Sequence, residues 1–400
     1  MKPGFEHTKK STNSTTGALK PKMFIISMFE PEAEVWYGIP EFNLLALNIS
    51  LPGLSPRYSD VHCTVDGEVC QLTIGESEIN AASSVLAVAL SAKFNLTATY
   101  WMVAGIAGIN PEIASTGSVT FARFAVQVGL QYEFDMRELP ANFTTGYVPL
   151  GVTSPDQYPK SIYGTEVFEV NTALQDIAIA YAKTASLNDS ADAIAYRANY
   201  MKDDIYAAGA ASPGVYACDV ATSDVYFSGR LLGEAFSNYT RLMTNGTGIY
   251  CTAAQEDNAT LEVLLRAAIA GLVDFSRIIV MRTASDYDRQ FPGEEAYFNL
   301  FYANQGSFLP AVKNLYLAGI KVVNGVLGEW DTKFAKGIPA PNYIGDIFGS
   351  LGGTPDFGPF ASSDNPVVVG RELNYGDGRR NIRNHRREGA GIKARVIGGA

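Results

Sequence analysis

Short apolar runs alternate with segments of helical periodicity along most of the chain. Residues 22–28 form a β-branched apolar run that predicts a buried first strand, and the Glu-Pro-Glu that follows predicts the start of a helix. An Ala-rich helix with Asn80 as its N-cap is predicted over 80–93, and a strand that ends in glycines over 100–109. Further along, the pattern predicts helices over 168–183, 261–273 and 309–326, and strands within 215–227 and over 277–282. Strands that alternate with helices predict an α/β fold.

One domain spans most of the chain, because neither an internal repeat nor a long polar linker interrupts it. We assign it to residues 22–358. The residues before it, 1–21, are rich in Lys, Ser, Thr and Gly and predict a disordered leader. Gly and Pro become dense from residue 349 on, and the Gly- and Arg-rich residues 359–400 predict a disordered tail.

Charge narrows the classes of function. The 400 residues carry 31 Lys and Arg against 41 Asp and Glu, a net charge of −10, and eight of the basic residues lie within the last thirty. The domain itself is therefore acidic, which argues against a nucleic-acid partner. No run of about 18 consecutive apolar residues is present, so we expect no membrane span.

Glycosylation sequons point to a secretory origin. Eight Asn-X-Ser/Thr triplets occur, against roughly three expected by chance, and they begin at Asn13, Asn48, Asn95, Asn142, Asn188, Asn238, Asn245 and Asn258. The leader nevertheless lacks the apolar block of a secretory signal. We predict an extracellular or cell-surface glycoprotein, with a cytoplasmic protein as the alternative.

Four cysteines allow two disulfides. Cys63 and Cys70 flank Asp66-Gly67, and a two-residue hairpin turn there would set these cysteines opposite one another. Cys218 and Cys251 would then form the second pair. Four buried thiols are the alternative, since a cysteine count decides little in a chain of this length.

Several catalytic chemistries are not expected from this sequence. Histidine occurs three times, at His7, His62 and His385, and no Gly-X-Ser-X-Gly motif is present, which argues against a Ser-His-Asp hydrolase. His and Cys do not recur at the short spacing of a zinc site, and we expect neither metal nor cofactor. The Gly105-Ile-Ala-Gly108 turn follows an apolar run and fits either a phosphate-cradling loop or a tight structural turn.

Carboxylates at the ends of strands are the remaining chemistry. Asp286 follows the apolar run 278–280 and would lie at the carboxyl end of that strand, where α/β sheets bind ligands. Glu32 and Glu256 each open a predicted helix and would meet Asp286 at the same edge if the sheet is mostly parallel. The alternatives are a solvated turn acid for Asp286 and ordinary helix-terminus charges for the two glutamates.

Five segments in sequence order resemble the nucleoside phosphorylase and nucleosidase superfamily, and more closely the fungal purine nucleoside permease family. They are Phe24-Ile-Ile-Ser-Met-Phe-Glu-Pro-Glu32, Gly75-Glu-Ser-Glu-Ile-Asn-Ala-Ala82, Ala104-Gly-Ile-Ala-Gly-Ile-Asn110, Gln255-Glu256 and Arg282-Thr-Ala-Ser-Asp286. The resemblance covers about residues 22–358. It implies a three-layer α/β domain with a central mixed, mostly parallel sheet flanked by helices.

The resemblance also implies a role for each matching residue. Asp286 would protonate N7 of a purine, with Ser285 orienting it, and Glu256 would accept hydrogen bonds from the ribose hydroxyls. Tyr226 and Phe227 match the position of the aromatic ring that stacks on the base, although an isolated pair of this kind is also typical of a core. The remaining substrate contacts would come from Gln255, Gly105 and Asn110.

Water or phosphate as the nucleophile is the last question. Where related phosphorylases have arginines, this chain has Glu30-Pro-Glu-Ala-Glu34, and several acids there would repel a phosphate dianion. In related nucleosidases the first-helix glutamate acts as base for water with help from the strand arginine, here Glu32 and Arg282, with Glu34 as the alternative base. We therefore predict a purine nucleosidase. The alternatives are a phosphorylase and a nucleoside-binding or uptake protein without catalysis, and the superfamily implies a homo-oligomer.

Overall fold

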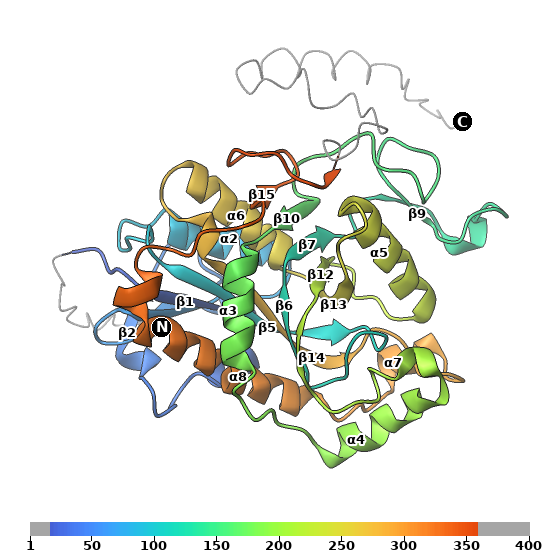
Figure 1. Ribbon diagram of the computed structural model, residues 1–400, viewed down its shortest axis with the longest axis horizontal. Helices are drawn as coiled ribbons and strands as arrows, with labels where there is room; N and C mark the ends of the chain where they lie inside the picture. Colours follow the sequence, from blue (N-terminus) through green and yellow to red (C-terminus); the bar gives the residue numbers. More distant parts are fainter. Residues whose placement is uncertain (1–16, 359–400) are drawn as a thin grey trace, which may run out of the picture.

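A mixed sheet lies between two layers of helices in the computed structural model, which describes residues 17–358 (Figure 1). The strands are β1 (Met23–Ser27), β2 (Leu47–Ser50), β3 (Asp60–Cys63), β4 (Val69–Thr73), β5 (Tyr100–Ile109), β6 (Val119–Ala122), β7 (Phe124–Gln127), β8 (Tyr132–Glu133), β9 (Tyr147–Val148), β10 (Val167–Glu169), β11 (Val215–Ala217), β12 (Asp219–Thr222), β13 (Tyr250–Ala254), β14 (Ile278–Tyr287) and β15 (Gly345–Asp346). The helices are α1 (Glu30–Glu34), α2 (Glu78–Ala89), α3 (Thr172–Ala182), α4 (Ala191–Arg197), α5 (Arg230–Met243), α6 (Asp257–Ile269), α7 (Ala296–Phe301) and α8 (Phe308–Gly328). The predicted three-layer α/β class is therefore confirmed.

Parallel pairing dominates the middle of the sheet. Strand β1 pairs in parallel with β4 and β5, and β14 runs parallel to β5 along its whole length. Strands β7, β12 and β13 form a second parallel group. Antiparallel pairs close the two ends, β3 with β2 and β4 at one end and β10 with β7 and β15 at the other.

The apolar runs of the sequence are central strands buried on both faces. In β1, Phe24 and Ile26 belong to the core shared with α2 and α6, whereas Met23 and Ile25 belong to the core shared with α3 and α8. Successive side chains of a strand point to opposite faces, so both layers of helices draw on the same strand. Such strands read as continuous rather than alternating apolar runs.

Strand β5 changes partners along its length, and this opens the sheet. Its first four residues pair with β1, and its last two, Gly108 and Ile109, pair with β13 in the antiparallel sense. Residues 104–107 between them pair with β14 alone. The ends of β1 and β13 therefore diverge over this stretch. Ligands of α/β sheets bind where the strand order switches in this way.

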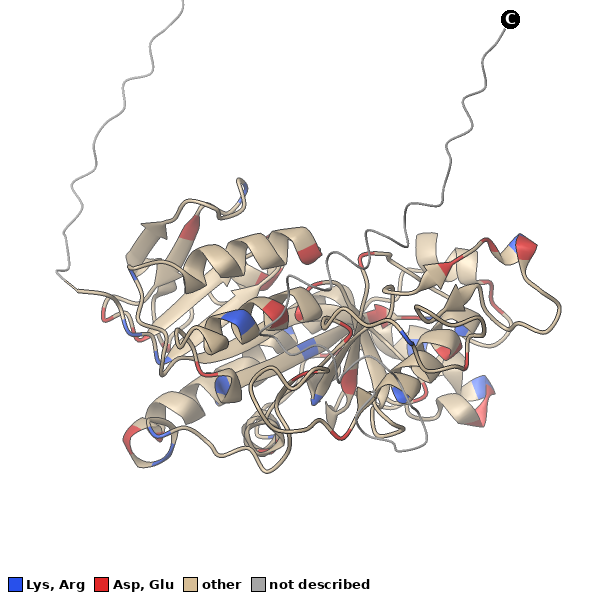
Figure 2. Ribbon diagram, turned by 90° about the horizontal axis from the view of Figure 1, so that it is seen from above, with Lys and Arg blue, Asp and Glu red and all other residues tan. Residues whose placement is uncertain are grey.

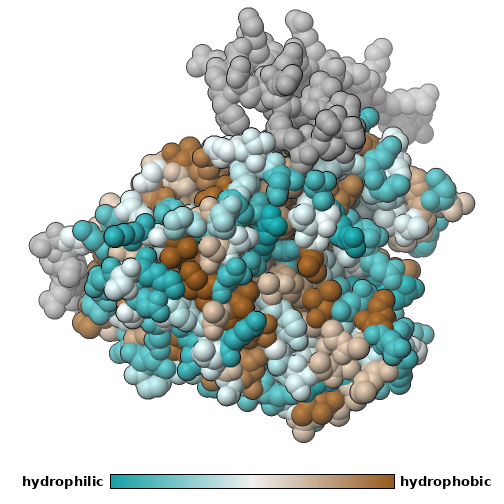
Figure 3. All heavy atoms as spheres, in the orientation of Figure 1, coloured by the Kyte–Doolittle hydropathy of each residue, from teal (hydrophilic) through white to brown (hydrophobic). Residues whose placement is uncertain are grey.

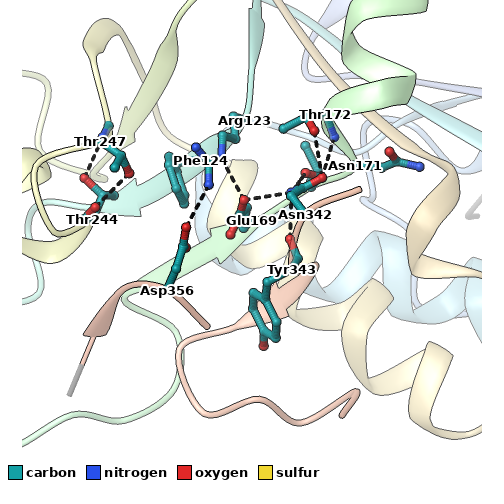
Figure 4. Close-up of polar contacts among 12 residues, drawn as sticks. Arg123, Phe124, Glu169, Asn171, Thr172, Thr244, Thr247, Asn342, Tyr343 and Asp356 are labelled. Atoms are coloured by element: carbon teal, nitrogen blue, oxygen red, sulfur yellow. Dashed lines mark hydrogen bonds and ion pairs between the residues drawn. The ribbon is translucent and has the colours of Figure 1, made fainter. Parts of the chain in front are cut away.

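The C-terminal segment is held against the sheet by a polar cluster (Figure 4). The Glu169 Oε1 atom of β10 accepts from Arg123 Nε at 2.7 Å and from Asn342 Nδ2 at 2.7 Å. Asn342 also accepts from the backbone N–H and the hydroxyl of Thr172, the first residue of α3. Charge-assisted hydrogen bonds of this kind fix the path of residues 342–346 beside β10.

Most predicted elements lie within a few residues of their expected places, with four corrections. Helix α2 begins at Glu78, so Asn80 lies inside its first turn and bonds the Glu76 carbonyl instead of capping the helix. Residues 167–169 are strand rather than helix, and β14 continues five residues beyond its expected end. The expected disordered leader is too long, because Leu19 bridges to Phe94. Residues 1–16 and 359–400 lie outside the described residues.

Cysteines and sequons can now be placed. The structure joins Cys63 to Cys70 across the β3–β4 hairpin and joins Cys218 to Cys251. Six of the sequon asparagines are exposed, and Asn13 lies outside the described residues. Asn258 is 3% exposed; it donates to the Thr165 carbonyl at 2.8 Å and accepts from the Thr222 hydroxyl. Asn258 is therefore a packed residue of α6 and not a surface site.

Charged and apolar residues of the described surface are both dispersed. In the view of Figure 2, Lys and Arg alternate with Asp and Glu instead of gathering on one face. The face seen in Figure 3 carries apolar residues in small groups among polar ones. Within residues 17–358, no helix combines the length and the apolar character needed to cross a bilayer.

Candidate functional site

A cavity of about 790 Å³ occupies the opening between β1 and β13. Its floor is the part of β5 from Ile106 to Gly108, and its walls come from α1, the end of β13, the end of β14 and the segment that leads into α8. It combines apolar side chains with a few convergent polar groups, which is typical of a small-molecule site.

Asp286 lies at one end of this cavity, near the end of β14. A register shift between Ala284 and Asp286 inserts Ser285 as an extra residue, and the Ser285 hydroxyl donates to Asp286 Oδ1 at 2.6 Å. The hydroxyl of Tyr226, at the exposed rim, donates to Asp286 Oδ2 at 3.3 Å. Burial raises the pKa of Asp286 and outweighs the two hydrogen bonds that lower it. A carboxyl group in this setting is suited to hold and donate a proton.

Glu32 lies at the other end, on the single turn of α1. Its Oε2 accepts from the Met28 N–H at 2.7 Å and its Oε1 from the Ile106 N–H at 2.6 Å, so the residue after β1 and strand β5 together fix the carboxylate. Burial raises the pKa of Glu32 to about 8, against the opposing effects of Arg282 and these two hydrogen bonds. The group therefore titrates close to neutral pH, as a general base should.

Arg282 and two acids, Asp257 and Glu256, form a buried charged group beside Glu32. Arg282 donates through Nε and Nη2 to both oxygens of Asp257, at 3.2 and 2.6 Å, and through Nη2 to Glu256 Oε2 at 3.0 Å. Its Nη1 bonds the Ile106 carbonyl at 3.1 Å. The side chain is 2% exposed, and each of its three nitrogens donates at least one of these bonds. It orients Glu256 and balances the negative charge of the cavity wall.

Glu256 is held from a second side by an unusual backbone. The Ser77 N–H donates to Glu256 Oε1 at 3.0 Å, and Ser77 has a φ of 76°, which non-glycine residues rarely adopt. Burial raises the pKa of Glu256, although Arg282 and the Ser77 N–H lower it. Strain of this kind concentrates at functional sites, where the surrounding contacts enforce it.

The distance between the two ends follows from the register of β5. A side chain at Gly105 would meet Arg282 and Glu32, and one at Gly108 would lie 3.7 Å from Asp286 Oδ2. Three residues of strand separate these glycines, which is about 10 Å. Beyond Glu32 the cavity becomes apolar, because Phe29 and Phe308 face one another with ring centroids 6.4 Å apart.

Eight of the ten predicted catalytic and substrate-binding residues line the cavity. They are Asp286, Glu32, Arg282, Glu256, Gln255, Tyr226, Phe227 and Ser285. The other two, Gly105 and Asn110, do not line it. Gly105 packs behind Arg282 and Glu32, where a Cβ would approach the Arg282 Nη1 and Met28 Sδ atoms to 2.5 Å. Asn110 is 3% exposed and caps the turn after β5 by accepting from the Glu112 N–H at 3.0 Å.

Three residues of the site were missed by sequence reasoning. Asp257, Ser77 and Asp288 each contact a predicted site residue or line the cavity. Asp257 adjoins Glu256, and an acid pair at the start of a helix next to a strand arginine was a usable signal. The alternative base Glu34 lies outside the cavity lining, on the far side of α1.

Metal ligation finds no support in the described part of the chain, where no group of three or more His, Cys, Asp and Glu side chains is placed to hold an ion. The cavity lining contains six acids, Glu32, Glu76, Asp192, Glu256, Asp286 and Asp288. Among the described lining residues, Arg282 is the one basic side chain. The site therefore suits a neutral, hydroxyl-rich ligand better than an anion.

Comparison with known proteins gives matches over most of the chain. The family model described as "Purine nucleoside permease (NUP)" matches residues 20–339. A purine nucleoside permease of Candida albicans is 44% identical over 357 residues, 88% of this chain and 86% of the relative. A probable purine nucleoside permease of Schizosaccharomyces pombe is 40% identical over 319 residues, 78% of this chain and 90% of the relative.

Solved structures give more distant likenesses. A 5'-methylthioadenosine/S-adenosylhomocysteine nucleosidase from Neisseria meningitidis has 13% identity and a TM-score of 0.44, and the match covers 77% of this chain and 99% of that one. The corresponding nucleosidase of Streptococcus pneumoniae has 14% identity and a TM-score of 0.44, covering 76% and 98%. Family membership rests instead on the family model and the fungal relatives, as the resemblance predicted. The chain belongs to the purine nucleoside permease family.

Proposed function

We propose that the protein binds purine nucleosides in this cavity and hydrolyses their N-glycosidic bond to free base and ribose. The observation that carries the proposal is the separation of roles along β5. Asp286, whose pKa burial raises, lies near Gly108, whereas Glu32, Glu256 and Arg282 converge near Gly105, three residues earlier on the strand. That separation suits a nucleoside whose base lies at Asp286 and whose sugar lies over the charged group.

The chemistry of the bond assigns each group a task. As the bond between N9 and the sugar breaks, its electron pair moves to the purine and positive charge develops on the sugar. Asp286 gives its proton to N7 of the departing base, and Glu256 accepts hydrogen bonds from the ribose hydroxyls. Glu32 takes a proton from water, whose oxygen bonds to the anomeric carbon. One water is consumed, and base and ribose are the products.

Water is favoured over phosphate as the nucleophile by charge. Arg282 is already neutralised by Asp257 and Glu256, and Glu32 adds a further carboxyl group beside it. A phosphate dianion brought to this end of the cavity would meet several carboxyl groups in a partly buried setting. Each Glu32 oxygen accepts one backbone N–H and keeps a lone pair for a water molecule.

A second candidate function is nucleoside binding linked to uptake, without cleavage. The names of the fungal relatives favour it, since both are described as purine nucleoside permeases. The same cavity would then serve as the binding site, and Asp286 would act as a hydrogen-bond donor to N7.

One assay separates these functions. Purified protein is incubated with inosine, adenosine or guanosine, with and without phosphate, and base, ribose and ribose 1-phosphate are measured. Hydrolysis predicts base and ribose in equal amounts at a rate independent of phosphate. Ribose 1-phosphate that requires added phosphate would replace hydrolysis with phosphorolysis. Saturable binding with no product would replace it with the binding function.

A further inference from the structure

A second buried charged cluster adjoins Asp286 at the end of β14. Asp288 and Arg289 follow the end of β14 and are 2% and 1% exposed. Arg289 donates through Nε to Asp288 Oδ1 at 2.8 Å and through Nη2 to Asp288 Oδ2 at 3.0 Å. The Tyr250 hydroxyl donates to Asp288 Oδ2 at 2.6 Å. The remaining arm of Arg289, Nη1, donates to Glu112 Oε1 at 2.7 Å.

This cluster joins four parts of the fold around the proposed acid. Asp288 and Arg289 extend β14, Tyr250 belongs to β13, and Glu112 lies in the turn after β5. Gly233 of α5 packs so closely that a Cβ there would overlap the Arg289 guanidinium and lie 2.9 Å from Asp288 Oδ2.

The backbone of Asp288 reinforces these links. Its N–H donates to the Ile109 carbonyl at 2.9 Å, and its carbonyl accepts from the Gly229 N–H at 2.8 Å. The end of the strand that carries Asp286 is therefore fixed from both sides.

Stability alone does not account for the cluster. Replacing a buried ion pair by apolar residues of similar volume is often neutral or stabilising, because two charges must be removed from water. Asp288 also lines the cavity and lies two residues from Asp286. The position of Asp288 therefore indicates a role in the cavity.

We propose that Asp288, clamped by Arg289 and Tyr250, is a positioning residue for Asp286. It fixes the end of β14 and places a negative charge near Asp286, which favours the proton on Asp286. This inference rests on the proposed function, in which that proton passes to N7 of the departing purine. The clamp fixes the Asp288 side chain, because it accepts two hydrogen bonds from a guanidinium and one from a phenol.

Several groups of the described residues act on the pKa of Asp286, and Asp288 is the one carboxylate among them that raises it. Burial is the largest cause of the raised pKa of Asp286, hydrogen bonds from Ser285 and Tyr226 lower it, and the charge of Asp288 raises it. Tyr196 is the other titratable neighbour, and the charge of Asp286 contributes to its raised pKa. On β5, Gly108 faces Asp286 without a titratable group, and a Cβ there would lie 3.7 Å from Asp286 Oδ2.

The test is the pH dependence of kcat/KM for nucleoside cleavage in wild type and Asp288→Asn. We expect the basic limb of the profile, where Asp286 loses its proton, to move at least half a pH unit lower in the variant. That is a threefold or larger change in the proton concentration at half-maximal activity. An unmoved basic limb would overturn the inference.

Matched variants separate charge from packing. Because Asp288→Asn leaves Arg289 short of a partner and could fail to fold, the double variant Asp288→Asn, Arg289→Met removes both ions and should show the same displacement. Tyr250→Phe keeps the charge and should lower kcat while the basic limb stays in place. Asp288→Glu should restore the limb. A merely structural role predicts lower kcat in every variant with no movement of the limb.

The outcome also separates this inference from the proposed function. If the wild-type protein releases no base, the proposed function fails and the role of Asp288 fails with it. If wild type cleaves nucleosides and neither charge-removing variant moves the limb, the role of Asp288 alone is overturned.

Discussion

Asp286 owes its chemical character to three neighbours and to burial. Ser285 and Tyr226 donate to its two oxygens, and Asp288 places a negative charge beside it. A carboxyl group in such a setting can stay protonated near neutral pH and so donate a proton at the moment a base departs. The proposed hydrolysis depends on this one proton.

The first prediction concerns a substitution that removes the acidic proton of Asp286. Asp286→Asn keeps the size of the side chain but has no acidic hydrogen, so we expect kcat to fall by roughly two to four orders of magnitude with KM little changed. Base release from inosine measures the effect. Asp135→Asn, the same exchange on an exposed loop, should keep the wild-type rate. Wild-type turnover in Asp286→Asn would contradict the role of general acid.

The second prediction concerns the pH dependence of nucleoside cleavage by the wild-type protein. Burial raises the pKa of Glu32 to about 8, and only the carboxylate form can take a proton from water. We therefore expect kcat/KM to rise with pH from 6 to 8 and to fall again once Asp286 ionises. Glu32→Gln should lack the rising limb along with most of its activity. A flat wild-type profile between pH 6 and 8 would exclude Glu32 as the base.

Single residues were predictable where their position in an element was clear. Asp286, Arg282 and Glu256 follow apolar runs or open helices, and the cavity lining contains all three. Asp257 was missed because it reads as an ordinary first-turn acid, and its bond to Arg282 exists only once β14 lies beside α6. Asn110 lies outside the cavity lining because it belongs to the turn after β5.

At the scale of elements, the close approach of α1, β5 and β14 makes the site. Gly105 on β5 allows it, since a side chain at this position would collide with the Arg282 guanidinium and the Met28 sulfur. The strand therefore contributes by having no side chain at one position. Its glycines were visible in the sequence, but only the three-dimensional register shows that Gly105 packs against the charged group and lies outside the cavity lining.

Gly105→Ala tests this packing. The added methyl group would come within 2.5 Å of Arg282 Nη1 and Met28 Sδ, so we expect a loss of about 1–3 kcal/mol in the free energy of unfolding and at least a tenfold drop in kcat/KM. Urea unfolding and the cleavage assay measure the two effects. Gly328→Ala at the end of α8, where nothing lies within 4 Å, is the control and should retain both. Equal behaviour of the two variants would refute the packing argument.

Element order was predictable because both-face burial leaves unbroken apolar runs such as 22–28 and 278–280. Element ends were less so. The start of α2 at Glu78 depends on Ser77 adopting a positive φ, and the conformational preference of serine does not predict this. The bulge at Ser285 likewise depends on the register between β14 and β5.

At the scale of the whole molecule, we expect the excess of negative charge to determine which ligands bind. The chain carries a net charge of −10, and the cavity also has an excess of acids. Its described lining includes six acids and one arginine. Charged ligands of the same sign are repelled both on approach and on binding. The molecule should therefore distinguish a nucleoside from its phosphate ester.

We accordingly expect AMP to be cleaved at least about 100-fold less efficiently than adenosine, since juxtaposed like charges cost several kcal/mol. The measurement is kcat/KM for each at low ionic strength and again at higher salt, where screening should narrow the gap. 5'-Deoxyadenosine, which also lacks the free 5'-hydroxyl but carries no charge, should resemble adenosine. Equal efficiencies for AMP and adenosine would contradict the electrostatic argument.

Asn258 carries a consequence for how the chain matures. Its side chain is enclosed between α6 and the residues around Thr165, yet it still displays the acceptor triplet to any oligosaccharide-transferring enzyme that meets the unfolded chain. A sugar attached there could not be accommodated once the helix docks. The fraction of chains that carry a glycan at Asn258 can be measured by mass spectrometry. It would therefore report how many molecules were glycosylated before folding and never reached the native state.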